Sequence, residues 1–203
     1  MIKLIDYGLG NILAFQNMYK RLNIPVSVAQ TSDDLTGATK LILPGVGAFD
    51  HAIQQLNSSG MRQCLEKLVL VNGIPVLGIC VGMQMLAECS DEGQQPGLGW
   101  IPGKVKSFKS LHLTNLILPH MGWNDVCPLP GNPLFDGLQE GAPFYFLHSY
   151  YFECTNEEDV AALSVYGKSF SSAVSYESIY GVQFHPEKSH SSGAQLLKNF
   201  ASI

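Results

Sequence analysis

A cysteine between two glycines is the first candidate for chemistry in this sequence. Cys80 lies at the centre of the Gly-x-Cys-x-Gly segment at 78–82, between an apolar run at 74–79 and a helical pattern at 83–88. Glycines on both sides allow a sharp turn from strand to helix, a nucleophile elbow, which exposes the central side chain above a sheet. The dipole and the free N–H groups of the following helix favour the thiolate over the thiol. A buried structural cysteine is the alternative interpretation, so the motif needs a base elsewhere.

A histidine and a glutamate about a hundred residues later supply that base and a group to orient it. His185 and Glu187 follow a predicted strand at 179–184, and Pro186 between them keeps His185 out of the helical region. In an extended segment, residues two apart point to the same face, and a carboxylate beside an imidazole orients the ring and stabilises the imidazolium. Cys80, His185 and Glu187 are therefore candidates for nucleophile, base and orienting group. A metal half-site or a surface ion pair is the alternative, although no second His/Cys cluster at ligand spacing supports a metal.

These segments resemble the motifs of the class I (triad) glutamine amidotransferase family, whose elbow has the form Gly-x-Cys-x-Gly-x-Gln and whose base segment contains His-Pro-Glu. Within that family, further stretches are similar to the glutaminase subunits that feed ammonia to a cyclase, and the likeness runs from Ile2 to Phe200. These stretches are Asp-Tyr-Gly-Leu-Gly-Asn at 6–11, Pro-Gly-Val-Gly-Ala-Phe at 44–49, Pro-His-Met-Gly-Trp-Asn at 119–124 and His-Pro-Glu-Lys-Ser at 185–189. The resemblance implies a glutaminase that hydrolyses L-glutamine to glutamate and ammonia.

In the mechanism that the resemblance implies, the Cys80 thiolate attacks the side-chain carboxamide of glutamine. His185 passes a proton to the departing nitrogen and then activates the water that frees glutamate; such acid–base assistance contributes about 10²- to 10⁴-fold in rate. The family forms its oxyanion hole from backbone groups, which here belong to Val46, Gly47 and Val81. The glycines around Val46 allow a ligand to approach the backbone closely, and an ordinary glycine turn is the alternative.

Gln84 and three residues implied by the resemblance are the candidate ligands of the substrate. Gln84 lies four residues after Cys80 on the same face of the predicted helix, where its amide could hold the α-carboxylate or the α-amino end of glutamine. An exposed surface glutamine is the alternative. By resemblance, Glu92 would accept the α-ammonium group, and the backbone at Ser149 and Tyr150 would hold the carboxylate. Glu92 falls in a predicted loop, where solvated acids are common.

Ammonia released into neutral water would be protonated, so a productive enzyme needs a partner docked over the site. By resemblance, the partner is a (β/α)8-barrel cyclase subunit, which forms a heterodimer with the chain and makes imidazole glycerol phosphate and aminoimidazole carboxamide ribotide in histidine biosynthesis. The implied docking residues are Asn11, Trp123, Asn124, Tyr145 and Lys188. Tyr145 would gate the ammonia path, and Lys188 would pair with an acid on the cyclase. Trp123 would anchor the interface, with an ordinary core aromatic as the alternative.

The elements that position these residues alternate between strands and helices in the first half of the chain. The strands are predicted at 2–6, 26–29, 41–43 and 74–79, and the helices at 12–22, 48–56, 61–71 and 83–88. This succession predicts an α/β fold with a doubly wound parallel sheet and right-handed crossovers. The active centre should then lie beyond the carboxyl ends of the strands.

The second half of the chain predicts an antiparallel or mixed extension of the same sheet. Its strands are predicted at 104–108, 116–118, 144–148, 151–153, 160–165, 172–176 and 179–183, with a turn-rich helical segment at 132–138 and a helix at 193–200. The expected fold is therefore a mainly parallel central sheet with helices on both faces and a mixed extension, as in flavodoxin-like proteins and class I glutamine amidotransferases.

Composition and charge exclude several other classes of protein. A length of 203 residues predicts one domain, 1–203, and a net charge of −5 argues against nucleic acid as the partner. The sequence has five cysteines, an odd number that cannot all pair within the chain, and none has Cys-x-x-Cys spacing. Neither a disulfide framework nor a zinc site is therefore expected. The Gly-Leu-Gly at 8–10 lacks the third glycine of a dinucleotide motif, so no cofactor and no metal are expected. Without a secretory signal or an apolar run of membrane-spanning length, we expect a cytoplasmic protein with no membrane contact.

Four other interpretations of the function remain open at this point. A sister amidotransferase that serves anthranilate, guanylate or pyridoxal phosphate synthesis is disfavoured by the stretches at 6–11 and 119–124. A duplicated copy that feeds a different synthetase, for example one in surface-polysaccharide sugar biosynthesis, would share the whole glutaminase site and differ only in its docking face. A cysteine peptidase or γ-glutamyl hydrolase gains no particular support from Gln84 or the glycines at 45 and 47. A non-enzymatic interaction module is disfavoured by the complete set of Cys80, His185 and Glu187.

Overall fold

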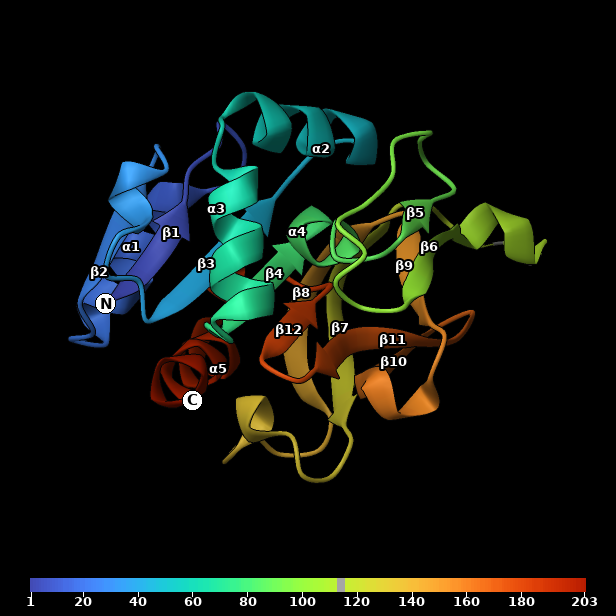
Figure 1. Cartoon of the computed structure of the whole chain (residues 1–203). Coiled ribbons are helices and arrows are strands. Elements are labelled where there is room, and N and C mark those ends of the chain that lie inside the picture. The colour runs from blue at the N-terminus through green and yellow to red at the C-terminus, as the bar shows by residue number, and fades with distance from the viewer. Residues whose placement is uncertain (113–115) are drawn as a thin grey trace.

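The computed structural model describes residues 1–112 and 116–203 (Figure 1). In the first half, strands and helices alternate as predicted: β1 (Ile2–Ile5), α1 (Ile12–Arg21), β2 (Val26–Ala29), β3 (Lys40–Gly45), α2 (Phe49–Ser58), α3 (Arg62–Glu66) and β4 (Val76–Cys80). The helix predicted at 61–71 changes its winding midway, because α3 continues as a π-helical segment over Lys67–Val71.

The second half consists mainly of strands and ends in one long helix. After the short helix α4 (Val81–Gln84) come β5 (Cys89–Ser90), β6 (Gly103–Ser107), β7 (His120–Pro128), β8 (Ala142–His148), β9 (Tyr150–Cys154), β10 (Val160–Tyr166), β11 (Lys168–Tyr176), β12 (Ile179–Val182) and α5 (His190–Ser202). Short 3₁₀ helices span Asp33–Leu35, Phe108–Leu111, Pro133–Phe135, Glu157–Asp159 and Pro186–Lys188.

One predicted strand is absent, and two predicted helical segments are much shorter than expected. The helix predicted at 83–88 is only the four-residue α4, because the carbonyls of the next residues accept hydrogen bonds from the loop at 98–100 instead of from a continuing helix. The strand predicted at 116–118 is absent, and the chain enters β7 only after Pro119, which has no N–H for a sheet. The segment predicted as helical at 132–138 forms only the three-residue 3₁₀ turn Pro133–Phe135.

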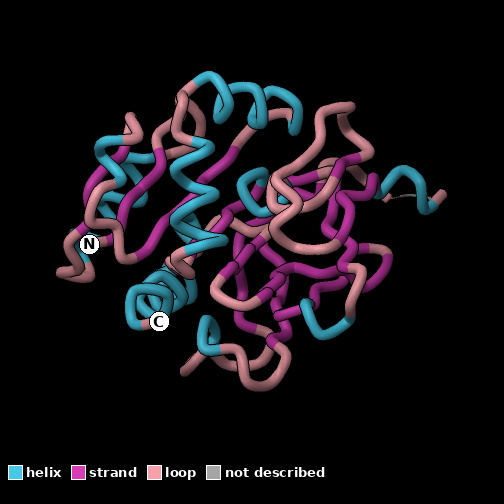
Figure 2. Tube along the Cα trace, in the orientation of Figure 1, coloured by secondary structure: helices cyan, strands magenta, loops and turns pink. Residues whose placement is uncertain are grey.

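The strands join into one mixed sheet that confirms the predicted fold class. Along the sheet the order is β2-β1-β3-β4-β12-β11-β10-β7-β8, parallel from β2 to β12 and antiparallel from β12 to β8. β9 pairs with β11 and with β6, and β6 pairs with β5. Figure 2 shows the strands as a continuous band with the longer helices around its parallel half. Strand β4, which carries Cys80, therefore lies inside the sheet and is bordered by parallel neighbours on both sides.

Helices cover both faces of the parallel half, and their apolar stripes explain where they pack. α3 crosses in front of the parallel strands in Figure 1, whereas α1 and α5 contact each other. In α1 the buried residues are Phe15 and Tyr19, four apart, and in α5 they are Gly193, Leu196, Leu197 and Phe200. This spacing places each set on one face of its helix. No helix within residues 1–112 and 116–203 is long and apolar enough to cross a membrane.

Candidate active site

Three adjacent parallel strands deliver the candidate catalytic segments to one edge of the sheet. In the register of β3 and β4, Gly45 lies opposite Cys80, and in that of β4 and β12, Ile79 lies opposite Val182. The residues that follow β3 and β12 therefore flank Cys80 on its two sides. A cavity of about 280 Å³ opens at this edge. Its lining residues are Val46, Gly47, Cys80, Val81, Gln84, Glu92, Pro119, Leu147, His148, Ser149, Tyr150, His185 and Lys188.

The turn at Cys80 has the strained geometry that its flanking glycines make possible. Cys80 adopts φ +56° and ψ −113°, which residues with a side chain rarely do. A Cβ at position 82 would lie 1.9 Å from the carbonyl oxygen of Leu43, and one at position 78 would lie 2.7 Å from the carbonyl oxygen of Gly82. Both glycines are thus required by the close contact of the turn with its own strand and with β3. Because α4 is only four residues long, the expected contribution of a helix dipole at the sulfur is reduced to a single turn.

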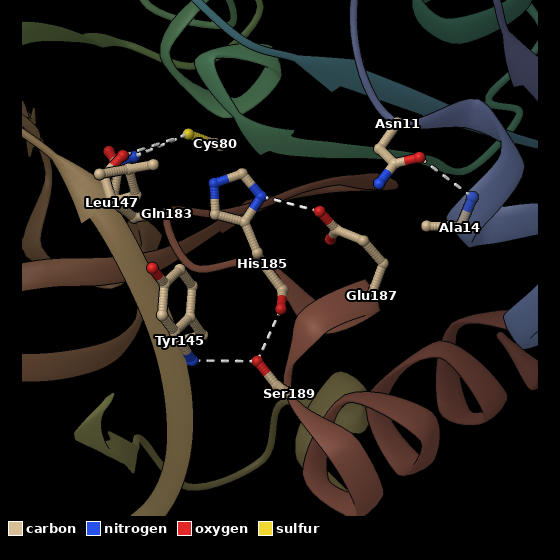
Figure 3. A network of polar contacts seen from close by, with 9 residues as sticks. All are labelled: Asn11, Ala14, Cys80, Tyr145, Leu147, Gln183, His185, Glu187 and Ser189. Atoms are coloured by element: carbon tan, nitrogen blue, oxygen red, sulfur yellow. Dashed lines mark hydrogen bonds and ion pairs between the residues drawn. The ribbon is translucent and has the colours of Figure 1, made fainter. Parts of the chain in front are cut away.

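The Cys80 sulfur points into the site, where polar groups surround it (Figure 3). Sγ lies 3.8 Å from Nε2 of Gln183 and 3.9 Å from the carbonyl oxygen of Leu147, although the residue as a whole is only 4% exposed. The His185 ring lies between Cys80 and Glu187 in the same view. A sulfur among polar groups on a cavity wall differs from the buried structural cysteine that was the alternative interpretation.

His185 lies between the sulfur and a carboxylate (Figure 3), and both groups raise its pKa. Its Nδ1 lies 2.9 Å from Oε1 of Glu187. Burial lowers the pKa of His185, but hydrogen bonds to Cys80 and Glu187 and the charges of both groups outweigh that effect and raise the pKa to about 10. The sulfur, the imidazole and the carboxylate therefore follow one another in space (Figure 3), in the order that a nucleophile, a base and its orienting group require.

The expected reason for the His185–Glu187 contact is wrong, although the contact itself is present. His185 is extended, with φ −104° and ψ 93°, but Glu187 lies in the 3₁₀ turn Pro186–Lys188 rather than in an extended segment. The turn folds the carboxylate back onto the ring. α5 can pack against this turn because residue 193 is glycine: a Cβ there would lie 1.8 Å from the carbonyl oxygen of Pro186.

The segment after β3 is exposed at its tip and anchored at both ends. Gly47 has φ +86°, and Val46 is 40% exposed at the cavity. Before it, the Tyr7 hydroxyl donates a hydrogen bond to the Pro44 carbonyl at 2.7 Å. After it, the backbone N–H of Phe49 at the start of α2 donates to Oε2 of Glu92 at 2.9 Å. Glu92 therefore lies in a loop as predicted, but it is partly buried and hydrogen-bonded at the edge of the cavity.

Gln84 is buried and engaged with the rest of the site. Its Nε2 donates to Oε1 of Gln183 at 3.0 Å and to the carbonyl oxygen of Tyr150 at 3.4 Å. At 3% exposure it is not the surface glutamine of the alternative interpretation. These two bonds occupy the amide nitrogen and leave the amide oxygen, a hydrogen-bond acceptor, for a ligand in the cavity.

The five expected docking residues differ in how they are placed. Trp123 is 50% exposed and stacks on His190 at 5.2 Å between ring centroids, so it is not a core aromatic. Nζ of Lys188 lies 5.6 Å from the centre of the Tyr145 ring, and Tyr145 lies edge-on to Trp123. Two of the five have structural roles within the chain: Asn11 accepts from the Ala14 N–H and caps α1, and Asn124 donates to the Val165 carbonyl oxygen.

Sequence reasoning missed three polar residues of the site. Gln183 lies next to the sulfur, and its only sequence signal was its position at the end of a predicted strand, two residues before the base. His120 and His148 are buried and in contact, with Nδ1 of His120 2.8 Å from Nε2 of His148. They are 28 residues apart, and neither lies in a motif that indicates pairing. Within residues 1–112 and 116–203, no three His, Cys, Asp or Glu side chains form a group that could hold a metal ion.

The buried histidine pair is expected to make the protein sensitive to mild acid. Burial lowers the pKa of His120 to about 4 and that of His148 to about 3, whereas an unfolded histidine titrates near 6.5. As the pH falls from about 6.5 toward 4, the unfolded state binds protons that the folded state excludes. The free energy of unfolding should therefore fall by up to ~1.4 kcal/mol per pH unit for each histidine. Urea unfolding of the wild type and of His120→Asn at pH 7, 6, 5 and 4.5 measures the effect; equal slopes for the two proteins would contradict it.

Comparisons with known proteins show which family this chain belongs to. The family described as glutamine amidotransferase class-I matches residues 3–203. The chain is 62% identical over 204 residues to the imidazole glycerol phosphate synthase subunit HisH of Bdellovibrio bacteriovorus, and 49% identical over 204 residues to that of Leptospira interrogans; each alignment covers 100% of both chains.

Solved structures share the fold at lower sequence identity. A crystal structure described as a glutamine amidotransferase superimposes with a TM-score of 0.77 at 20% identity, over 100% of this chain and 99% of the other. A structure described as PurLQS from Thermotoga maritima gives a TM-score of 0.74 at 16% identity, over 99% of this chain and 97% of the other.

Proposed function

The chain belongs to the class I glutamine amidotransferase family, and on that premise we propose that it is the glutaminase subunit of an imidazole glycerol phosphate synthase. It hydrolyses L-glutamine and supplies the ammonia for imidazole glycerol phosphate synthesis in histidine biosynthesis. The main support for this function is that Cys80 and the His185–Glu187 pair lie together at one cavity. In addition, the chain aligns over its whole length with a protein named as a subunit of imidazole glycerol phosphate synthase.

Hydrolysis proceeds through a covalent intermediate on Cys80. The thiolate attacks the side-chain carbonyl carbon of glutamine, and the oxygen becomes an oxyanion. His185, held as imidazolium beside Glu187, gives its proton to the departing nitrogen, so ammonia leaves and a γ-glutamyl thioester remains. The neutral imidazole then takes a proton from water as the water attacks the thioester. Glutamate leaves, and Cys80 returns to the thiolate.

Backbone donors hold the oxyanion in both steps. The N–H of Val81 follows the nucleophile directly, and the backbone of Val46 and Gly47 reaches the same cavity from β3. One well-placed donor of this kind stabilises a transition state by about 3 kcal/mol. The position of this short segment thus has a large influence on the rate.

The non-reacting end of glutamine binds to Glu92, to Gln84 and to the backbone at 149–150. Glu92 accepts from the α-ammonium group, and the free amide oxygen of Gln84 is a second acceptor on the cavity wall. Backbone groups at Ser149 and Tyr150 hold the α-carboxylate. The support for this orientation is that all four residues line the cavity that contains the sulfur.

The ammonia passes to a cyclase subunit that covers the cavity. The docking face consists of Asn11, Trp123, Asn124, Tyr145 and Lys188. The exposed Trp123 is the anchor that such an interface requires, and Lys188 combines a cation at the cavity with a contact to the Tyr145 ring. A copy that feeds a different synthetase is not favoured, because relatives at 62% and 49% identity over their whole length are named as subunits of imidazole glycerol phosphate synthase.

The partner is expected to accelerate glutamine hydrolysis by about 100-fold, the effect of completing one oxyanion donor. Gly47 has φ +86° and nothing within 4 Å of a built Cβ, so the peptide at 46–47 can turn away from the oxyanion when the chain is alone. Glutamate release is measured for the chain alone, with purified cyclase, and with a purified synthetase that aminates a sugar. Equal rates alone and with cyclase would contradict the expectation. If the sugar-aminating synthetase accelerated hydrolysis and the cyclase did not, the chain would instead be a duplicated copy that feeds a different synthetase.

A further inference from the structure

Two buried imidazoles contact each other inside an aromatic cluster beside the cavity. His120 on β7 stacks between Phe146 and Tyr166, with ring centroids 4.8 and 4.0 Å away, and His148 at the end of β8 packs against Phe108 and Phe170. The exposed fractions of the two histidines are 4% and 5%. Burying an imidazole in such surroundings is unfavourable unless its nitrogens are hydrogen-bonded.

All four ring nitrogens of the pair have a partner, and the partners fix both tautomers. Nδ1 of His148 lies 2.7 Å from the carbonyl oxygen of Tyr150, so it must carry the proton. Its Nε2 is then an acceptor, and Nδ1 of His120 donates to it at 2.8 Å. Nε2 of His120 in turn accepts from Nδ2 of Asn124 at 3.2 Å. The pair is complete only when both rings are neutral, and burial lowers the pKa of both.

The same carbonyl connects the histidine pair to the nucleophile. The Tyr150 oxygen also accepts from Nε2 of Gln84, which donates to Oε1 of Gln183. Gln183 donates from its own Nε2 toward Sγ of Cys80 at 3.8 Å. Hydrogen bonds therefore run without a gap from β7, on the expected docking face, to the sulfur. The Tyr150 carbonyl is the point at which the two arms of this network meet.

We propose that His120 and His148 are positioning residues for glutamine. The His148 N–H fixes the Tyr150 carbonyl, and with it the backbone at 149–150 on the cavity wall, and His120 locks His148 in the tautomer that makes this bond. The inference rests on the proposed function, because it assigns the pair to the segment that binds the substrate carboxylate. Apolar side chains could fill the aromatic cluster without needing hydrogen-bond partners. The two imidazoles therefore contribute something else, the orientation of the Tyr150 carbonyl.

Replacing the donor on His120 tests this role. His120→Phe keeps the stacked ring but leaves Nε2 of His148 without its donor, whereas His120→Asn keeps a donor near the Nδ1 position. For the complex with cyclase, we expect His120→Phe to raise the KM for glutamine about tenfold with kcat changed less than about threefold, because the segment binds the non-reacting end of the substrate. His120→Asn should restore KM to within about threefold of the wild type.

Two further variants complete the experiment. Tyr166→Phe is the matched control, since its ring stacks on His120 but its hydroxyl bonds to the Ile117 carbonyl outside the network, and it should leave KM unchanged. His148→Gln keeps an acceptor toward His120 but removes the N–H that donates to Tyr150. It should therefore raise the KM for glutamine as His120→Phe does. It replaces His120→Phe in the experiment if His120→Phe does not fold.

The outcomes separate this inference from the proposed function. A wild-type complex that turns over glutamine, together with folded His120→Phe or His148→Gln variants of unchanged KM, would overturn the positioning role alone. Equal KM increases in His120→Phe, His120→Asn and Tyr166→Phe would also overturn it, because they would indicate a general packing effect. A wild-type complex that does not hydrolyse glutamine would overturn the proposed function and the positioning role together.

Discussion

Cys80→Ala is expected to abolish glutamine-dependent synthesis by the complex while ammonia-dependent synthesis continues. The substitution removes the sulfur on which the proposed thioester forms, and loss of a covalent nucleophile costs at least about 10⁴-fold in turnover. The cysteine side chain is small and lies on the cavity wall, so alanine leaves little void. Cyclase activity is measured with glutamine and, separately, with ammonium salt at alkaline pH.

A second cysteine variant controls for loss of a thiol in general. Cys89 lies on the short strand β5, is exposed and lies outside the cavity, so Cys89→Ala should keep both activities. Loss of both activities in a well-folded Cys80→Ala complex would contradict the separation of glutamine hydrolysis from ammonia use. Retention of glutamine-dependent synthesis would exclude Cys80 as the nucleophile.

Gly82→Ala is expected to cause the largest loss of stability among single substitutions at the elbow. A Cβ at this position would lie 1.9 Å from the Leu43 carbonyl oxygen and 2.9 Å from its carbon. Both atoms belong to the backbone of β3 within the sheet, so they cannot rotate aside, and β3 and β4 would have to separate. Overpacking of this kind costs about 3 kcal/mol or more of the free energy of unfolding.

The matched control is a glycine whose only requirement is its dihedral angle. Gly60, after α2, has φ +73° and nothing within 4 Å of a built Cβ, so Gly60→Ala should cost only about 1–2 kcal/mol. Urea unfolding of both variants gives the two losses. If Gly82→Ala were no less stable than Gly60→Ala, the close contact between the elbow and β3 would not be the reason that position 82 requires glycine.

Much of the fold could be predicted where the sequence pattern is local. β2 was predicted with its observed bounds because Pro25 limits it on one side. α1 and α2 were predicted with slightly different bounds, because their apolar residues recur at helical spacing. β7 was missed because its sequence, from His120 to Pro128, has no apolar alternation; most of its pairing partners lie on β8. Residues 85–87 have a helical pattern, yet their carbonyls bond to a loop more than ten residues away, which no local pattern reveals.

The candidate site shows the same division between local and distant information. The proximity of Cys80, His185 and Glu187 (Figure 3) could be predicted because each lies in a short motif that indicates a definite chemical role. The 3₁₀ turn that brings Glu187 onto the ring could not, because spacing alone suggested an extended segment. The contact between His120 and His148 could not be predicted for a different reason. No sequence pattern marks a single buried histidine, and only the pairing of β7 with β8 brings His120 opposite His148.

The position of β12 also determines when during synthesis the chain can become active. β12 is among the last elements to be made, yet it inserts between β4 and β11 and carries His185 and Glu187 at its end. A nascent polypeptide that has left the ribosome only as far as β11 contains the thiol but has neither the imidazole nor the carboxylate. On the proposed mechanism, such unfinished chains cannot hydrolyse glutamine, and hydrolysis begins only after β12 has joined the sheet.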